Sequence, residues 1–205
     1  MGRVVDSRFL GEAFVTLFVI MDPLGTIPLF LALTSGRSPR ARRRAAWQAV
    51  VVAFAVICSF AVFGQQLLDY LGIGIPALQG AGGLLLLLVA LELLTGRAED
   101  PQQVQDVNVA LVPLGTPLLA GPGAIVATIV FVRRADGAAD LVALGVAIAA
   151  VHVTMWLALR FSTVIMRVIR EGGIVLVTRI AGLLLSAIAV QLVASSVVGF
   201  VAAAR

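Results

Sequence analysis

The stretch that decides the fold is residues 21–30, Met-Asp-Pro-Leu-Gly-Thr-Ile-Pro-Leu-Phe, inside an apolar run from 9 to 33. A carboxylate, two prolines and a glycine disfavour a continuous helix here. A similar interruption lies ninety residues later, inside the apolar run 109–132, and reads Pro113-Leu114-Gly115-Thr116-Pro117 and then Gly121-Pro122-Gly123. Lipid tolerates unwound backbone only where protein buries it or where it lines a cavity. The sequence therefore predicts two membrane segments that are broken inside the bilayer.

Composition places the chain in a membrane. Of its 205 residues, 60% are hydrophobic and 13% are charged, whereas soluble domains carry about 25% charged residues. The apolar runs lie at 9–33, 46–68, 74–95, 109–132, 139–160 and 180–202. About 20 apolar residues span the hydrocarbon layer as a helix. We therefore expect an all-α membrane protein with six transmembrane helices, which form one transmembrane domain over residues 1–205.

The arginines predict the orientation of these segments. All fifteen basic residues are arginines, and ten of them lie in the loops after the first, third and fifth segments. Positive loops stay in the cytoplasm, so we expect a multi-pass membrane protein with both termini outside. The net charge of +4 is spread over loops rather than along one stripe, so we expect no nucleic-acid partner. The single Cys58 excludes an intramolecular disulfide, and we expect no metal or cofactor.

The two halves of the chain resemble each other. Pro-Leu-Gly-Thr occurs at 23–26 and again at 113–116, each time in the first segment of a half. Gly82-Gly83-Leu84-Leu85-Leu86 aligns with Ala181-Gly182-Leu183-Leu184-Leu185, and the same register places Glu92 opposite Gln191. Three crossings per half is an odd number, so two copies must insert in opposite orientations. We therefore predict inverted repeats over about 9–95 and 109–202, a plan that many secondary transporters share.

Asp22 is the one carboxylate at the centre of a predicted segment. Asp is a preferred N-cap, and proline is favoured at the first helical position, so Asp22-Pro23 predicts a second half-helix that runs to Leu33. One interpretation is that Asp22 only caps this helix. The other is that it also binds a cation, a proton or a substrate amine, because ionisable groups inside membrane segments are costly and usually functional. The two interpretations are compatible.

Both interruptions would open half-helices whose free N–H groups favour an anion. A substrate carboxylate could sit between them, with the hydroxyls of Thr26 and Thr116 as further donors. The alternative is that proline and glycine only kink packed helices. The substrate-binding candidates are Asp22, Pro23, Gly25, Thr26, Pro28, Gly115, Thr116, Pro117, Gly121, Pro122 and Gly123.

Three further polar residues are candidates for a gate or a proton relay: Glu92, Gln191 and His152. The competing explanation for Glu92 is a position at the headgroup level beside Arg97. His152 lacks Cys, Asp or Glu at metal-ligand spacing, so an interhelical hydrogen bond is its alternative role. Gly80, Gly82 and Gly83 predict close packing of the third segment against a neighbour.

At Asp22-Pro23-Leu24-Gly25-Thr26-Ile27-Pro28-Leu29-Phe30, the chain resembles the MarC family of bacterial inner-membrane proteins. The stretch from Pro113 to Ile125 is similar to that family's second motif. The resemblance covers nearly the whole chain. It implies a relation to the amino-acid exporter superfamily, which is built from six helices, and one archaeal relative is described as a transporter of small neutral amino acids such as glycine and alanine.

The leading hypothesis is a secondary transporter or exporter of small metabolites, with small neutral amino acids as the first candidates and the substrate site between the two broken helices. The chain has no lysine and hence no phosphate-binding loop of the Gly-x-x-x-x-Gly-Lys type, so an ion or solute gradient would have to drive transport. An enzyme is not expected, because no second deep carboxylate or Gly-x-Ser-x-Gly motif accompanies Asp22 and His152. The alternative is a membrane scaffold or regulatory protein without transport. The expected partners are a small-molecule substrate and the lipid bilayer, and a homo-oligomer remains open.

Overall fold

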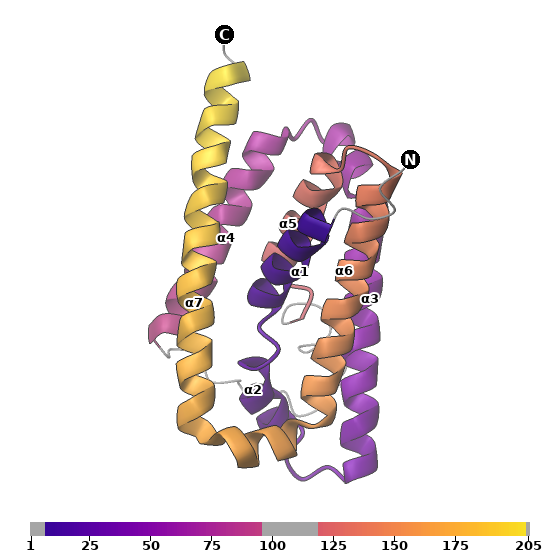
Figure 1. Cartoon of the computed structure of the whole chain (residues 1–205), viewed down its shortest axis with the longest axis vertical. Coiled ribbons are helices and arrows are strands. Elements are labelled where there is room, and N and C mark those ends of the chain that lie inside the picture. The colour runs from indigo at the N-terminus through magenta and orange to yellow at the C-terminus, as the bar shows by residue number, and fades with distance from the viewer. Residues whose placement is uncertain (1–6, 96–118, 204–205) are drawn as a thin grey trace.

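Seven helices make up the part of the chain that the computed structural model describes, residues 7–95 and 119–203. The described residues include no strand. The helices run side by side as an elongated bundle (Figure 1). In chain order they are α1 (Ser7–Met21), α2 (Thr26–Leu33), α3 (Pro39–Tyr70), α4 (Ile75–Thr95), α5 (Pro122–Arg134), α6 (Ala138–Arg160) and α7 (Ser162–Ala203). The predicted all-α class is confirmed.

Four stretches are long and apolar enough to cross a membrane, namely Pro39–Tyr70, Ile75–Thr95, Ala138–Arg160 and Gly172–Ala203. A fifth span forms if α1 and α2, which meet at a bend of 45°, are taken together. The predicted fourth segment, 109–132, is described only from residue 119, and its second part forms α5. The sixth crossing and the inverted repeats therefore stay predictions.

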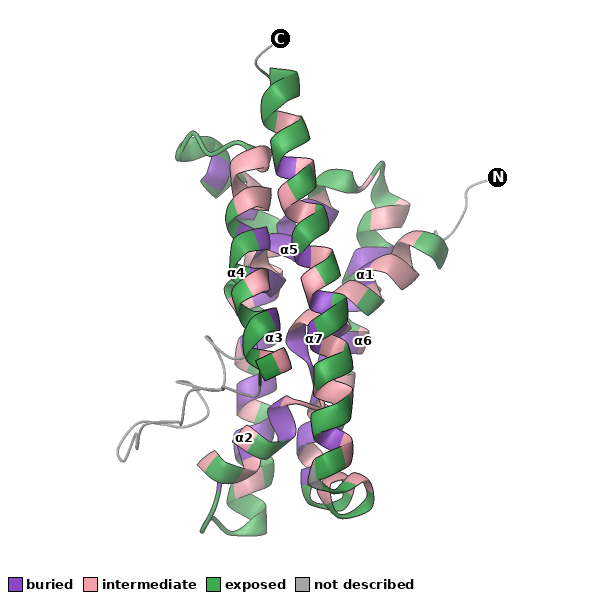
Figure 2. Cartoon of the chain, turned by 90° about the vertical axis from the view of Figure 1, so that its left-hand side faces the viewer, coloured by how far each residue is buried: buried purple, intermediate pink, exposed green. Residues whose placement is uncertain are grey.

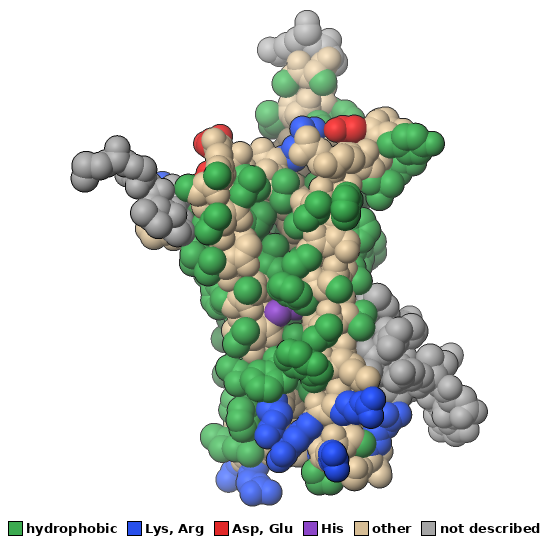
Figure 3. All heavy atoms as spheres, turned by 90° about the vertical axis from the view of Figure 1, so that its right-hand side faces the viewer, with side chains coloured by type: hydrophobic (Ala, Val, Ile, Leu, Met, Phe, Trp, Pro, Cys, Tyr) green, Lys and Arg blue, Asp and Glu red, His purple; other side chains and the backbone are tan. Residues whose placement is uncertain are grey.

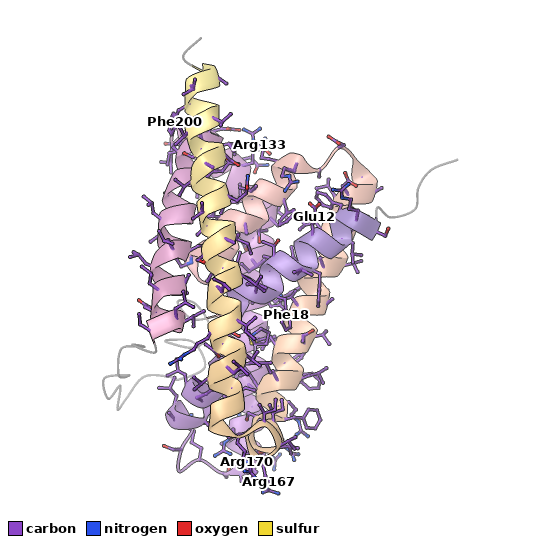
Figure 4. The ribbon with its side chains drawn as sticks, turned by 60° about the vertical axis from the view of Figure 1, so that its left-hand side comes forward. Glu12, Phe18, Arg133, Arg167, Arg170 and Phe200 are labelled. Carbon is purple, nitrogen blue, oxygen red and sulfur yellow. The ribbon has the colours of Figure 1, made fainter. Side chains whose placement is uncertain are left out.

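The pair α1–α2 crosses the bundle instead of folding back. At one end, Arg134 at the end of α5 forms an ion pair of 3.4 Å with Glu12 of α1. At the other end, Arg42 in the first turn of α3 donates a hydrogen bond of 3.5 Å to the carbonyl of Thr34, just after α2. Glu12 and Arg133 are labelled near one end of the molecule in Figure 4, and Arg167 and Arg170 near the other. The two helices of the first interruption thus have contacts toward opposite ends of the bundle.

Two helices are longer than the apolar runs that predicted them. Helix α3 begins at Pro39, because Ser38 caps it by accepting a hydrogen bond of 3.3 Å from the Ala41 N–H and because proline suits the first helical position. The predicted loop arginines 40–44 are therefore helical. Helix α7 begins at Ser162 and contains a kink at Arg170, where φ is +58°. The membrane-spanning part of α7 starts at Gly172 instead of the predicted 180.

The interior consists of three packed clusters, the smallest of which joins α2, α6 and α7 around Ile27, Ala158 and Ile174. The larger core joins α1, α2, α3, α5 and α6 around fully buried side chains such as Leu17, Phe30, Ile57 and Met155. A smaller cluster joins α4 and α7 around Leu86 and Leu185. Outward-facing residues of the long helices are exposed (Figure 2) and largely apolar, as expected for helices that face lipid tails.

Glycines bring α4 and α7 together, as predicted. A Cβ on Gly83 would lie 2.8 Å from the carbonyl oxygen of Ala189 and 3.1 Å from the backbone nitrogen of Val193. A Cβ on Gly80 would lie 2.7 Å from the hydroxyl of Ser196. This hydroxyl donates a hydrogen bond of 2.6 Å to the carbonyl of Pro76 at the start of α4. Small residues let membrane helices approach at backbone distance, where dispersion contacts are densest.

A candidate site at the break in the first span

Asp22 ends one helix and begins the next turn. Its N–H still donates to the carbonyl of Phe18, 3.0 Å away, so it closes α1. Its φ of +37° then turns the chain out of the helical path. Positive φ is rare outside glycine, and Asp is among the few residues enriched there. The predicted break is therefore confirmed at Asp22, and α2 starts at Thr26, three residues later than Pro23 suggested.

The two carboxylate oxygens of Asp22 have different surroundings. Oδ1 accepts a hydrogen bond of 3.0 Å from the Gly25 N–H and so caps the turn before α2, whereas the N-cap of α2 itself is Gly25, without a side-chain cap. Oδ2 is buried and has no hydrogen-bond partner among the described residues. The whole residue is only 9% exposed. A buried polar atom without a partner is costly, so the geometry leaves one oxygen ready to accept a hydrogen bond from a ligand or to hold a proton.

Gly25 provides the space beside this free oxygen. A Cβ at position 25 would overlap Asp22 Oδ2 and would lie 2.9 Å from the hydroxyl oxygen of Thr178 on α7. The carboxylate, the glycine backbone and the threonine hydroxyl therefore converge on one small region between α2 and α7. Thr178 was not among the candidates predicted from sequence. Its neighbour Arg179 is charged, so both residues were assigned to the loop between the apolar runs 139–160 and 180–202.

Thr26 stabilises the break from the other side. Its hydroxyl donates a hydrogen bond of 2.8 Å to the carbonyl of Asp22, and the carbonyl of Met21 lies 3.5 Å away. These carbonyls belong to the end of α1, where backbone acceptors lack partners within the helix. The hydroxyl hydrogen that was predicted to serve a substrate carboxylate is thus engaged with the backbone in this structure.

The second interruption reaches the same region from α5. Helix α5 starts at Pro122, after Gly121 in an extended conformation. A Cβ on Gly123 would lie 3.4 Å from the side chain of Ile20, in the last turn of α1. Leu119 and Ala120, just before α5, belong to the same buried cluster as Met21 at the end of α1. The predicted candidates Gly115, Thr116 and Pro117 lie outside the described residues, so their place in the site is a prediction.

The two prolines of the first motif take different positions. Pro23 is buried directly after the break, whereas Pro28 is exposed within the first turn of α2. A proline in the first turn costs no helical hydrogen bond, because the first N–H groups have no intrahelical acceptor. Pro28 therefore shapes the start of α2 and does not face Asp22.

The three candidates for a gate or relay do not join this site. Glu92 and Gln191 are both exposed on the outer faces of α4 and α7. His152 is only 4% exposed, and its ring packs edge-on against Phe54 of α3, with 5.2 Å between the ring centroids. Nδ1 lies 2.8 Å from the carbonyl of Ile148 in the same helix, and Nε2 has no partner in the hydrogen-bond geometry of the described residues. The backbone of Ala53 on α3 also approaches the ring, so the interhelical hydrogen bond of His152 stays a prediction. No group of three potential metal ligands occurs within residues 7–95 and 119–203.

A bundle of long apolar helices with a broken span that buries a carboxylate defines an integral, multi-pass membrane protein. Residues 7–201 match the family described as MarC family integral membrane protein, and the chain belongs to this family. It is 35% identical to a UPF0056 membrane protein of Methanocaldococcus jannaschii, with 95% of this chain and 98% of that protein covered. It is 33% identical to one of Escherichia coli, covering 95% and 94% of the two chains. It is 37% identical to one of Aquifex aeolicus, covering 89% of each. No solved structure matches the chain.

Proposed function

We propose that this MarC-family protein is a secondary transporter or exporter of small neutral amino acids. The observation that carries the proposal is the free oxygen of Asp22, which is buried at the break of a membrane span. An unpaired carboxylate at that depth is hard to explain by stability alone. A neutral amino acid carries an ammonium group that can pair with Asp22 and a carboxylate that suits helix N-termini.

The start of α5 supplies the second half of the proposed binding site. Its first turn lies against the last turn of α1 through Gly123 and Ile20. The substrate carboxylate is assigned to the start of α5, because the N–H groups of Gly25, Thr26 and Ile27 at the start of α2 are already bonded to Asp22 and Leu24. A short substrate side chain fits best, because Gly25 and Thr178 leave little room beside the aspartate.

The contact between α4 and α7 supports the inverted repeats that such a site requires. Gly83 abuts Ala189, and a Cβ on Gly182 would lie 3.2 Å from the carbonyl oxygen of Ala90. Any antiparallel helix pair makes contacts in such reciprocal positions. The residue types support the repeat, because each contact pairs a glycine with an alanine. The repeat alignment that matches Gly83 with Gly182 also matches Ala90 with Ala189.

Flux in proteoliposomes tests the proposal. The full-length protein should carry labelled glycine and alanine across the bilayer, and the flux should respond to an imposed pH gradient if a proton is coupled. A large or strongly charged solute serves as the control and should be excluded. The absence of flux for every small amino acid would contradict the proposal and would favour a scaffold or regulatory protein.

We propose that the arginine-rich end of the bundle faces the cytoplasm. Arginines gather at one end of the face shown in Figure 3, and the start of α1 and the end of α7 lie at the opposite end (Figure 1). Because Cys58 is the only cysteine, Cys58→Ser gives a background for labelling. A membrane-impermeant maleimide should label Asp136→Cys in intact spheroplasts and Ser35→Cys only after permeabilisation. The reverse pattern would overturn the orientation.

A further inference from the structure

We propose that a small cavity at the arginine-rich end binds the phosphate group of an anionic phospholipid. The cavity has a volume of about 90 Å³ and lies where the start of α3 meets the corner between α6 and α7. Its polar lining consists of Arg42, Arg43, Arg160, Ser162 and Thr163. This is several times the space that one water molecule needs, and the three arginines that line it match a phosphate in charge.

An unsatisfied donor supports an anionic ligand. The Nε atom of Arg42 is buried and has no acceptor among the described residues. Within residues 7–95 and 119–203, the side chain of Glu171 left aside, the ion pairs involve Arg8, Arg133 and Arg134, which all lie at the other end of the bundle. Three arginines that line one cavity repel each other and favour an anionic ligand.

The position along the bundle favours a lipid as the source of that phosphate. Trp47 and Trp156 pack edge-to-face, with ring centroids 6.2 Å apart. Trp47 follows Arg43 by one helical turn, and Trp156 precedes Arg160 by one turn. Tryptophan marks the membrane–water interface, so the cavity lies at the headgroup level. Basic pockets between membrane helices on the cytoplasmic side are suited to anionic headgroups.

The surface below the tryptophans could carry the acyl chains. Between α3 and α6, the residues one to two turns deeper than the tryptophans are exposed and apolar, and they include Val51, Phe54 and Val153. Figure 3 shows this face, with the arginines at one end and hydrophobic side chains beyond them. A headgroup in the cavity and its chains along this surface would form one continuous contact, which a free phosphate could not make.

Native mass spectrometry of the full-length protein with added lipid tests the site. Phosphatidylglycerol should bind as a defined adduct, and phosphatidylcholine should not. Arg43→Gln together with Arg160→Gln should weaken this binding on the order of thirtyfold, given the usual contribution of arginines near an anionic headgroup. The matched control is Arg40→Gln with Arg44→Gln, which removes two charges from the same helix end outside the cavity and should change binding less than about twofold.

A second pair of variants keeps the arginines intact. Thr163 is exposed on the rim of the cavity, so neither Thr163→Glu nor Thr163→Gln should disturb the fold. The glutamate should repel the headgroup and abolish the adduct, whereas the glutamine should retain it. If Arg40→Gln with Arg44→Gln reduced lipid binding as much as Arg43→Gln with Arg160→Gln, the general positive charge of the surface would explain the binding. That result would overturn the proposed site. Displacement of the lipid by inorganic phosphate at comparable concentration would overturn the lipid assignment.

Discussion

Asp22→Asn is expected to reduce amino-acid flux in proteoliposomes by about thirtyfold, the loss expected from one hydrogen bond between charged groups worth about 2 kcal/mol. The fold should survive, because an asparagine oxygen can still accept the hydrogen bond that Oδ1 takes from the Gly25 N–H. What disappears is the negative charge of the buried, unpaired side of the carboxylate. Initial rates of glycine and alanine uptake, with equal amounts of reconstituted protein, provide the measurement.

Asp136→Asn is the matched control. Asp136 is exposed in the turn before α6, at the end of the bundle opposite the start of α3, so the same chemical change there should leave flux unaltered. The pH gradient separates two roles of Asp22. If the variant still exchanges amino acids but no longer responds to the gradient, Asp22 carries the proton. Flux of Asp22→Asn within about twofold of the wild type would contradict the proposed site.

The break itself could be predicted from sequence because its signal is local. Asp22, Pro23 and Gly25 oppose a continuous helix whatever surrounds them, and the structure places the turn among them. The exact partners depended on the tertiary fold. Asp22 adopts positive φ and caps the Gly25 N–H, and Thr26 binds the end of α1 instead of facing a ligand. Periodicity and composition do not determine which of two carbonyls a hydroxyl will reach.

Residues that come from distant parts of the chain were harder to foresee. Thr178 belongs to helix α7, whose candidate span begins at Gly172, and the charges at Arg170 and Arg179 obscured that start. Arg179 is exposed, so its long side chain can extend toward the headgroups while its backbone stays in the span. The polar residues Glu92, Gln191 and His152 attracted attention because they are rare in apolar segments. They differ from Asp22 in their surroundings, because Glu92 and Gln191 are exposed and His152 contacts a carbonyl of its own helix.

The close approach of α4 and α7 leads to the second prediction with a large effect. Gly83→Ala should destabilise the protein by about 1–3 kcal/mol, the usual range for an overpacked interior. The added methyl would meet the carbonyl oxygen of Ala189 at 2.8 Å and the backbone nitrogen of Val193 at 3.1 Å. A side chain could rotate away from such a contact, but two backbones in packed helices can separate only by moving a whole helix.

Gly145→Ala is the control for this substitution. Gly145 lies within α6, is exposed, and has open space around its missing side chain. Alanine is a better helix former than glycine by up to about 1 kcal/mol, so this variant should be as stable as the wild type or slightly more stable. Thermal unfolding in detergent, followed by the fluorescence of Trp47 and Trp156, should show the unfolding temperatures of the two variants moving in opposite directions.

The same measurement tests whether the helices unfold together. Because those tryptophans lie on α3 and α6, a lower unfolding temperature after Gly83→Ala would show that the α4–α7 pair unfolds cooperatively with the larger core. An unchanged transition would instead mean that α4 and α7 can separate on their own, which would contradict a bundle held together through Gly83.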